Sequence, residues 1–126
     1  MKIVTAGIIC HGDTVLIARR AAGEKFAGYW EFPGGKLEPG ETPEQGLQRE
    51  LWEELGVQVE VGDFVGESTY EYAQGALRLL AYRVRLLSDA LRLTVHDEYK
   101  FVEVRELTTY DLLPADIPLA LQLARE

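Results

Sequence analysis

The chain opens with two apolar segments separated by a polar turn. Residues 2–10, KIVTAGIIC, are dominated by β-branched and small apolar side chains, and residues 14–18, TVLIA, return to the same composition. The break between them, His11-Gly12-Asp13, contains two common turn formers. Apolar β-branched runs on either side of such a turn predict two antiparallel strands joined as a hairpin.

A loop and a short aromatic strand are expected next. Residues 21–28 are rich in small side chains, which favours a loop. Residues 29–32 form the aromatic run YWEF, which is followed at once by a proline and two glycines. Aromatic residues favour strands, whereas proline and glycine interrupt them. We therefore expect one short strand that stops before residue 33.

An amphipathic helix is predicted after residue 42 by signals at both of its ends. Thr42 is a favourable N-cap, Pro43 suits the first helical position, and Gln45 completes a capping box. Gly56 suits the position just beyond the C-terminal end. The buried side of this helix is indicated by leucines that recur every four residues, Leu47, Leu51 and Leu55.

The rest of the chain favours strands and closes with a helix. The segments rich in β-branched and aliphatic residues are 57–72, 77–87, 100–104 and, as a shorter strand, 91–95. Residues 114–125 predict a terminal helix with Asp116 near its start. The order of strands, helix, strands and helix predicts an α/β domain with helices packed on a mixed β-sheet.

Composition narrows the class of protein. The 126 residues are about the size of one domain, and no apolar run is long enough to span a bilayer. The N-terminus lacks the apolar stretch and cleavage site of a signal peptide, so a cytoplasmic location is expected. The single cysteine, Cys10, can form no intrachain disulfide and is expected to be buried in its strand.

The charge balance argues against a nucleic-acid surface. The formal net charge is −8 and the pI is about 4.8, whereas nucleic-acid binding needs clustered Lys and Arg. An acidic protein can still bind polyphosphate where divalent cations provide the attraction. No segment predicts a membrane contact or an obligate protein partner, so the positions of the carboxylates become the informative feature.

Three glutamates of the predicted helix form an acidic cluster. Glu50, Glu53 and Glu54 are spaced i, i+3 and i+4 and therefore share one face. Like charges at this spacing repel one another, and the helix dipole disfavours anions in the last turn, where Glu53 and Glu54 lie. One interpretation is a solvated acidic face. The other is a set of hard oxygen ligands for Mg²⁺ or Mn²⁺.

The residues around this cluster match a known motif. Residues 35–57 read GKLEPGETPEQGLQRELWEELGV and agree at each specified position with the Nudix box, G-x5-E-x7-R-E-U-x-E-E-x-G-U with U aliphatic. With WEFPGGK before the box and LPADIP near the C-terminus, the chain resembles MutT-type Nudix hydrolases and their relatives that act on cytidine triphosphates. The resemblance implies one Nudix hydrolase domain over residues 1–126, with the α/β/α sandwich fold of that family.

The resemblance also implies a metal-dependent reaction and its ligands. Glu50, Glu53 and Glu54, joined by the backbone carbonyl of Gly34, would hold Mg²⁺ or Mn²⁺. Arg49 would hold one of these carboxylates in orientation. Water would then attack a phosphorus atom, with the metal neutralising the diphosphate and a carboxylate taking the proton.

The sequence leaves the proton acceptor open. Glu50 and Glu53 are candidates, and so is Asp97, which lies in a segment matching a loop that carries an acidic residue in relatives. A solvated loop charge is an equal alternative for Asp97. Glu41 either joins the network around Arg49 or serves only as an acid near the helix N-terminus.

Four residues are candidates for binding the nucleotide. Arg20 and Lys36 would contact phosphates, although an ordinary surface cation is the competing interpretation. Phe32 would stack on the base or pack in the core. Asp116 would accept hydrogen bonds from the base edge, or it would cap the final helix.

The expected function is hydrolysis of (deoxy)nucleoside triphosphates to a monophosphate and pyrophosphate, as in enzymes that clear the nucleotide pool. Cytidine-type nucleotides and oxidised purines such as 8-oxo-dGTP both stay open as substrates. Asp116 favours the first, and Gln74-Gly75, in place of the Asp-Arg pair of purine-selective relatives, weakens the second. The alternatives are a hydrolase of another nucleoside diphosphate derivative such as ADP-ribose, and a catalytically silent Nudix-fold ligand sensor.

Overall fold

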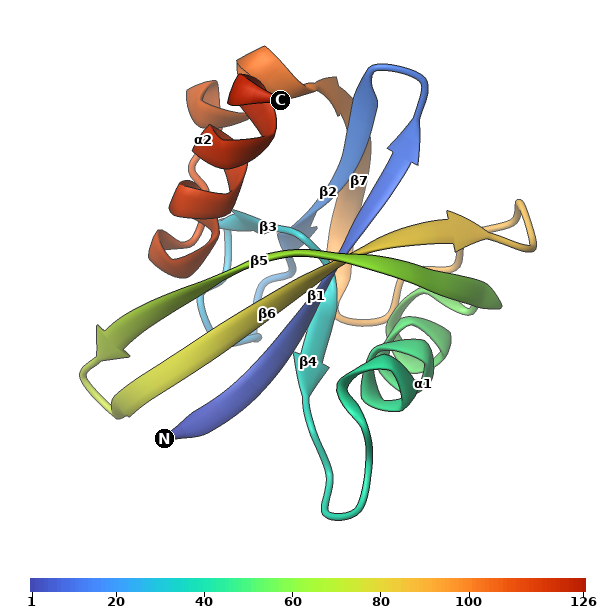
Figure 1. Ribbon diagram of the computed structural model, residues 1–126. Helices are drawn as coiled ribbons and strands as arrows, with labels where there is room; N and C mark the ends of the chain where they lie inside the picture. The colour runs from blue at the N-terminus through green and yellow to red at the C-terminus, as the bar shows by residue number, and fades with distance from the viewer.

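The computed structural model describes residues 1–126, in which a mixed β-sheet carries helices on both sides (Figure 1). The strands are β1 (Lys2–His11), β2 (Thr14–Arg20), β3 (Trp30–Glu31), β4 (Gly34–Lys36), β5 (Val59–Tyr72), β6 (Gly75–Leu86) and β7 (His96–Glu103). The helices are α1 (Pro43–Leu55) and α2 (Ile117–Arg125), with two short 3-10 helices, Val104–Thr109 and Pro114–Asp116. The α/β expectation is confirmed.

Strand β1 lies at the centre of the sheet. The strand order is β3-β2-β1-β6-β5, with β4 also paired to β1 and β7 paired to β2. β1 and β6 run parallel, and the other strand pairs are antiparallel. The predicted hairpin between β1 and β2 is present, with Cys10 opposite Val15.

The central strands are buried on both faces because each face of the sheet carries a helix. Ile8 of β1 belongs to a core cluster that includes Leu119 of α2. The next residue, Ile9, belongs to a second cluster that includes Leu51 of α1. Neighbouring residues of a strand point to opposite faces, so two-sided burial explains an apolar run without polar alternation. Figure 1 shows α1 and α2 on opposite sides of the sheet.

Helix α1 begins and ends where the sequence predicts. The backbone N–H of Gln45 donates to Thr42 Oγ1 at 3.1 Å, and the backbone N–H of Thr42 donates to Gln45 Oε1 at 3.0 Å, so the capping box is formed. Gly56 ends the helix in the left-handed conformation, with φ of 65°. The three leucines of the predicted stripe are fully buried. Together these contacts fix the rotation of the helix and the direction of its glutamates.

The strand predicted at residues 91–95 is absent, because this segment serves the C-terminal end of α1 instead. The backbone N–H of Arg92 donates to the Leu55 carbonyl at 2.8 Å, and that of Thr94 donates to the Glu54 carbonyl at 3.2 Å. The last carbonyls of a helix have no partner within the helix itself. Residues 91–95 donate hydrogen bonds to these carbonyls and do not pair with a strand.

Two strands differ from the prediction in extent. Gly34–Lys36 forms β4 beside β1, where only a turn was expected. A Cβ built on Gly34 would overlap the Thr5 carbonyl, so this close pairing requires glycine. β7 begins at His96, well before the predicted start at residue 100. The prediction missed residues 96–99 because most of them are polar, as is common in a strand with one face in solvent.

Cys10 and Asp116 lie near the ends of β1 and α2 respectively. Cys10 is exposed, contrary to expectation, since it lies just past Ile9, the last β1 residue paired with β6. Asp116 stands at the N-terminal end of α2 as predicted, preceded by a 3-10 turn that begins at Pro114. Neither α1 nor α2 has the length and apolar character needed to cross a membrane.

Candidate active site

One cavity brings most of the candidate residues together. Its volume is about 350 Å³, and it is lined by residues of strands β1 to β6, helix α1 and the second 3-10 helix. The predicted residues in its wall are Arg20, Phe32, Gly34, Lys36, Glu50, Glu54 and Asp116. The predicted residues outside the wall are Arg49, Glu53 and Asp97.

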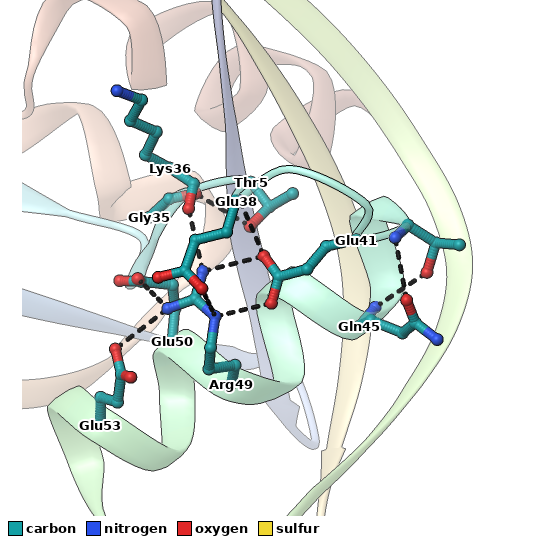
Figure 2. Close-up of polar contacts among 10 residues, drawn as sticks. Thr5, Gly35, Lys36, Glu38, Glu41, Gln45, Arg49, Glu50 and Glu53 are labelled. Atoms are coloured by element: carbon teal, nitrogen blue, oxygen red, sulfur yellow. Dashed lines mark hydrogen bonds and ion pairs between the residues drawn. The ribbon is translucent and has the colours of Figure 1, made fainter.

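Arg49 ties together the carboxylates of the motif. Its Nε and Nη2 donate to the two oxygens of Glu41 at 2.6 and 3.0 Å. Its Nη1 donates to Glu50 Oε1 at 2.7 Å and to Glu53 Oε1 at 3.0 Å, while Nη2 also reaches the Lys36 carbonyl at 3.0 Å. Figure 2 shows the guanidinium at the centre of these acceptors, with the Lys36 ammonium pointing away. Only the planar fork of arginine can serve so many acceptors at once.

The charges in this network stabilise one another. Hydrogen bonding to Arg49, followed by the backbone N–H of Glu38, lowers the pKa of Glu41. Hydrogen bonds to Glu41 and Glu50 raise the pKa of Arg49 further above its already high value. Glu41 therefore belongs to the network around Arg49, which decides between the two roles considered for it.

A glycine also fixes the position of Glu50. A Cβ built on Gly35 would overlap the carboxylate of Glu50, and Gly35 is not in the left-handed region of backbone space. The requirement for glycine is therefore one of space rather than of backbone conformation. The Gly35 carbonyl accepts a hydrogen bond from Thr5 Oγ1 at 3.2 Å, which anchors this segment to β1.

Two residues of the site were missed by the sequence reasoning. The His96 side chain is fully buried, and its Nε2 lies 2.8 Å from Glu31 Oε2. Candidate ligand atoms of Glu31, Glu54 and His96 all lie within 4.8 Å of one another. Glu31 also accepts a hydrogen bond from Arg20 Nη1 at 3.1 Å. An acid inside a buried aromatic run was the available signal for Glu31. No local signal marked His96, because its direction depends on a β-bulge at the neighbouring Asp97.

Asp97 does not reach the cavity. Its Oδ1 accepts a hydrogen bond from Arg19 Nε at 2.8 Å, and its side chain is 44% exposed. The pairing of β2 with β7 shifts here, with Arg19 opposite Glu98 and Arg20 opposite His96, so Asp97 is the unpaired residue of a bulge. His96 is thereby directed inward and Asp97 outward. Asp97 therefore lies outside the cavity wall and is paired with Arg19.

The acidic cluster is suited to a divalent cation. Glu54 Oε1 is buried and has no hydrogen-bond partner. Burial, reinforced by the neighbouring Glu31 and Glu50, raises the pKa of Glu54 to about 9. Either a proton or a cation can relieve such crowding of carboxylates. Carboxylate oxygens and the Gly34 carbonyl are the hard donors that Mg²⁺ and Mn²⁺ prefer, so these residues fit the metal that the motif implies.

Basic residues surround the acidic cluster in spite of the negative net charge. Those in the cavity wall are Lys2, Arg20, Lys25 and Lys36. Arg20 is held firmly, since its Nε donates to the Lys25 carbonyl at 2.8 Å and its Nη2 lies 3.5 Å from Glu24 Oε1. A ligand that carries several phosphates would meet cations and carboxylates in the same cavity.

One part of the cavity wall, which we call the apolar end, consists of Phe26, Phe32, Tyr72 and Ala115 and contains one buried acid, Asp116. Asp116 makes no side-chain cap to α2, which argues against the capping role. Its Oδ2 instead accepts a hydrogen bond from the Phe32 backbone N–H at 2.9 Å. Burial mainly, with help from Glu31, raises the pKa of Asp116, while the Phe32 N–H works in the opposite direction. The Phe32 side chain is 3% exposed and packs in the core.

Comparisons with known proteins agree on one family. The model of the NUDIX domain family matches residues 1–123. A Mycobacterium tuberculosis protein provisionally named 8-oxo-dGTP diphosphatase 2 is 44% identical, over 98% of this chain and 89% of the relative. The CTP pyrophosphohydrolase of Escherichia coli is 40% identical, over 92% and 86% of the two chains. The crystal structure of a MutT protein from Methanosarcina mazei superposes with a TM-score of 0.88 at 26% identity, covering 98% and 93%.

The raised pKa of Glu54 predicts how the stability of the metal-free protein depends on pH. Between its ordinary pKa of 4.5 and about 9, the folded protein holds a proton that the unfolded chain has released. The free energy of unfolding must therefore decrease as the pH rises through this interval. Urea denaturation in chelator from pH 5 to 9 measures the slope. We expect Glu54→Gln to flatten it, and Glu60→Gln, at an exposed ion pair with Arg85, to leave it unchanged. Equal slopes in all three proteins would contradict the burial of Glu54.

Proposed function

This chain belongs to the Nudix family, and from that premise we propose that it hydrolyses nucleoside triphosphates to a monophosphate and pyrophosphate with the help of Mg²⁺. One observation carries the proposal: a single cavity joins a crowded carboxylate cluster, several cations and an apolar end with a buried acid. Relatives named for CTP and 8-oxo-dGTP support the choice of triphosphates. Residues 1–126 would then act as one Nudix hydrolase domain.

The metal ligands in this proposal are Glu50, Glu53, Glu54 and the Gly34 carbonyl. Glu50, Glu54 and Gly34 line the cavity. Glu53 lies on the same face of α1 as Glu50 and Glu54, at its exposed edge, where Arg49 holds it. When bound, Mg²⁺ would neutralise the diphosphate and lower the pKa of the attacking water. The orphaned, buried oxygen of Glu54 supports this assignment most directly.

The protein's own groups bind the phosphates, orient the carboxylates and accept the proton. Arg20 and Lys36, which both line the cavity, would contact the phosphates. Arg49 fixes Glu50 through one carboxylate oxygen, Oε1. The other oxygen, Oε2, is left to accept the proton of the attacking water, and we assign Glu50 this role. Glu31, held by His96 and Arg20, closes the cluster and positions Arg20.

Product analysis tests the proposed reaction. Incubation with Mg²⁺ and a panel of normal, methylated and oxidised nucleoside triphosphates should release a monophosphate and pyrophosphate in equal amounts. Chromatography of the products, with pyrophosphate and orthophosphate assayed separately, measures the outcome. Orthophosphate as the first product would refute cleavage to a monophosphate. No turnover of any nucleotide, including ADP-ribose, would favour a ligand sensor over an enzyme.

Replacing Glu53 tests the metal assignment. Glu53→Gln keeps the size and helix propensity of the side chain but removes one anionic ligand. We expect turnover with excess Mg²⁺ to fall by at least about tenfold, and Mn²⁺ affinity measured by electron paramagnetic resonance to fall with it. Without metal, stability should hold or rise, because repulsion within the cluster is reduced. The control is Glu44→Gln, an exposed position on the same helix. Wild-type Mn²⁺ affinity in Glu53→Gln would exclude Glu53 as a ligand.

We assign to Asp116 the role of distinguishing between nucleotide bases. Its Oδ2 is occupied by the Phe32 N–H, which leaves Oδ1 for the ligand. An ionised carboxylate only accepts hydrogen bonds. It therefore favours the amino group of cytosine and disfavours O4 of uracil. Because burial raises the pKa of Asp116, the carboxylate gains this preference only as the pH rises.

The prediction is a pH-dependent ratio of kcat/KM between cytosine and uracil triphosphates. In the wild-type protein the ratio should increase as the pH is raised, because burial raises the pKa of Asp116 and the carboxylate ionises only above that raised pKa. The side chain of Asp116→Asn cannot ionise, so the ratio for this variant should not change with pH. At high pH the ratio should be about five- to hundredfold lower than in the wild type, because one hydrogen bond worth on the order of 1–3 kcal/mol is lost. A ratio that matches the wild type at every pH would mean that Asp116 does not read the base.

A further inference from the structure

We propose that Phe26 is a base-binding residue, whose ring forms a stacking surface at the apolar end of the cavity. The proposal rests on the proposed function, since it requires the ligand to be a nucleotide. Phe26 lies in the loop between β2 and β3 and lines the cavity together with Tyr72 and Asp116. Its side chain remains 39% exposed, whereas the Phe32 ring beside Asp116 is 3% exposed. Phe26 therefore offers accessible aromatic surface that Phe32 does not.

The backbone at Phe26 has an unusual conformation. Phe26 is the only residue other than glycine with a positive φ, 57°. Aromatic residues adopt this region at an energetic cost, and such strain often marks residues placed for function. Loop composition alone would have favoured a glycine here, and Gly23 and Gly28 in the same loop do have positive φ. The conformation instead directs a large ring to the cavity wall.

The loop that carries Phe26 is anchored to the phosphate-contacting Arg20. The side chain of Arg20 donates to the Lys25 carbonyl at 2.8 Å, and its backbone carbonyl accepts from the Gly28 N–H at 2.9 Å. The Tyr29 N–H closes a turn onto the Phe26 carbonyl at 3.1 Å. These contacts hold Phe26 in its strained conformation and connect its loop to Arg20.

Tyr72 connects Phe26 to the residue assigned to the base edge. The two rings have their centroids 5.3 Å apart and are tilted by 46°. The Tyr72 hydroxyl accepts a hydrogen bond from the Ala115 N–H at 3.4 Å, immediately before Asp116. A base that rests on Phe26 would thus present its edge toward the segment carrying Asp116. Stacking is tolerant of base identity because every base has a π-face, so Phe26 would supply affinity and Asp116 would supply selectivity.

The test separates ring stacking from loop structure. Phe26→Asn removes the ring but keeps a residue type that tolerates positive φ, and Phe26→Tyr restores an aromatic face. The matched control is Phe101→Asn, at an exposed phenylalanine on β7 with the same 39% exposure and no place in the cavity wall. The measurements are KM and kcat for cytosine and uracil triphosphates, together with Ki for inorganic tripolyphosphate, which has phosphates but no base.

We expect KM of Phe26→Asn to rise by about tenfold for both nucleotides, with kcat, the cytosine-to-uracil ratio and Ki nearly unchanged. Phe26→Tyr and Phe101→Asn should behave like the wild type. An unchanged KM in Phe26→Asn would overturn the proposal. An equal rise in Ki would also overturn it, because the loop would then act only by positioning Arg20.

The proposed function fails separately, if the wild type hydrolyses no nucleotide at all. In that event calorimetric titration with cytidine monophosphate and with orthophosphate still tests Phe26. Weaker binding of the nucleotide alone in Phe26→Asn supports the stacking role. Equal binding of the nucleotide by Phe26→Asn and the wild type, or no binding to either, excludes it.

Discussion

The site depends on one guanidinium placed among carboxylates. Helix α1 brings Glu50, Glu53 and Glu54 to one face, where mutual repulsion and the helix dipole both oppose them. Arg49 offsets part of this by donating to Glu50 and Glu53 while it is itself held through two bonds to Glu41. An isolated surface ion pair contributes little, but a partly buried network with several satisfied donors also fixes geometry. Arg49 therefore holds Glu50 and Glu53 in position without a metal ion.

The parts of this arrangement that are local in sequence were predictable. The capping box of Thr42 and Gln45, the terminal Gly56 and the leucine stripe together specify where α1 begins, where it ends and which side it buries. Each signal concerns residues three or four positions apart, where backbone geometry alone determines the contact. The same holds for the hairpin of β1 and β2, whose register follows from its short turn.

The parts that depend on distant segments were not predictable in this way. Residues 91–95 have the composition of a strand, yet they satisfy the carbonyls at the end of α1, a need visible only in three dimensions. The inward position of His96 follows from a bulge where β7 pairs with β2. Its partner Glu31 lies on β3, which pairs with the other edge of β2. A bulge shifts the alternation of side chains by one residue. This shift directs His96 into the site and leaves Asp97 facing Arg19.

The two ends of the cavity are built by different means. The acidic end comes largely from the continuous segment 34–54, so its geometry is set by one helix and one strand. The apolar end is assembled from separate segments, with the Phe32 N–H and the Tyr72 hydroxyl both holding the short 3-10 helix that bears Asp116. Neither of these hydrogen bonds involves a residue that Arg49 contacts. The two ends are nevertheless coupled through Glu31, which accepts a hydrogen bond from Arg20 and helps to raise the pKa of both Glu54 and Asp116.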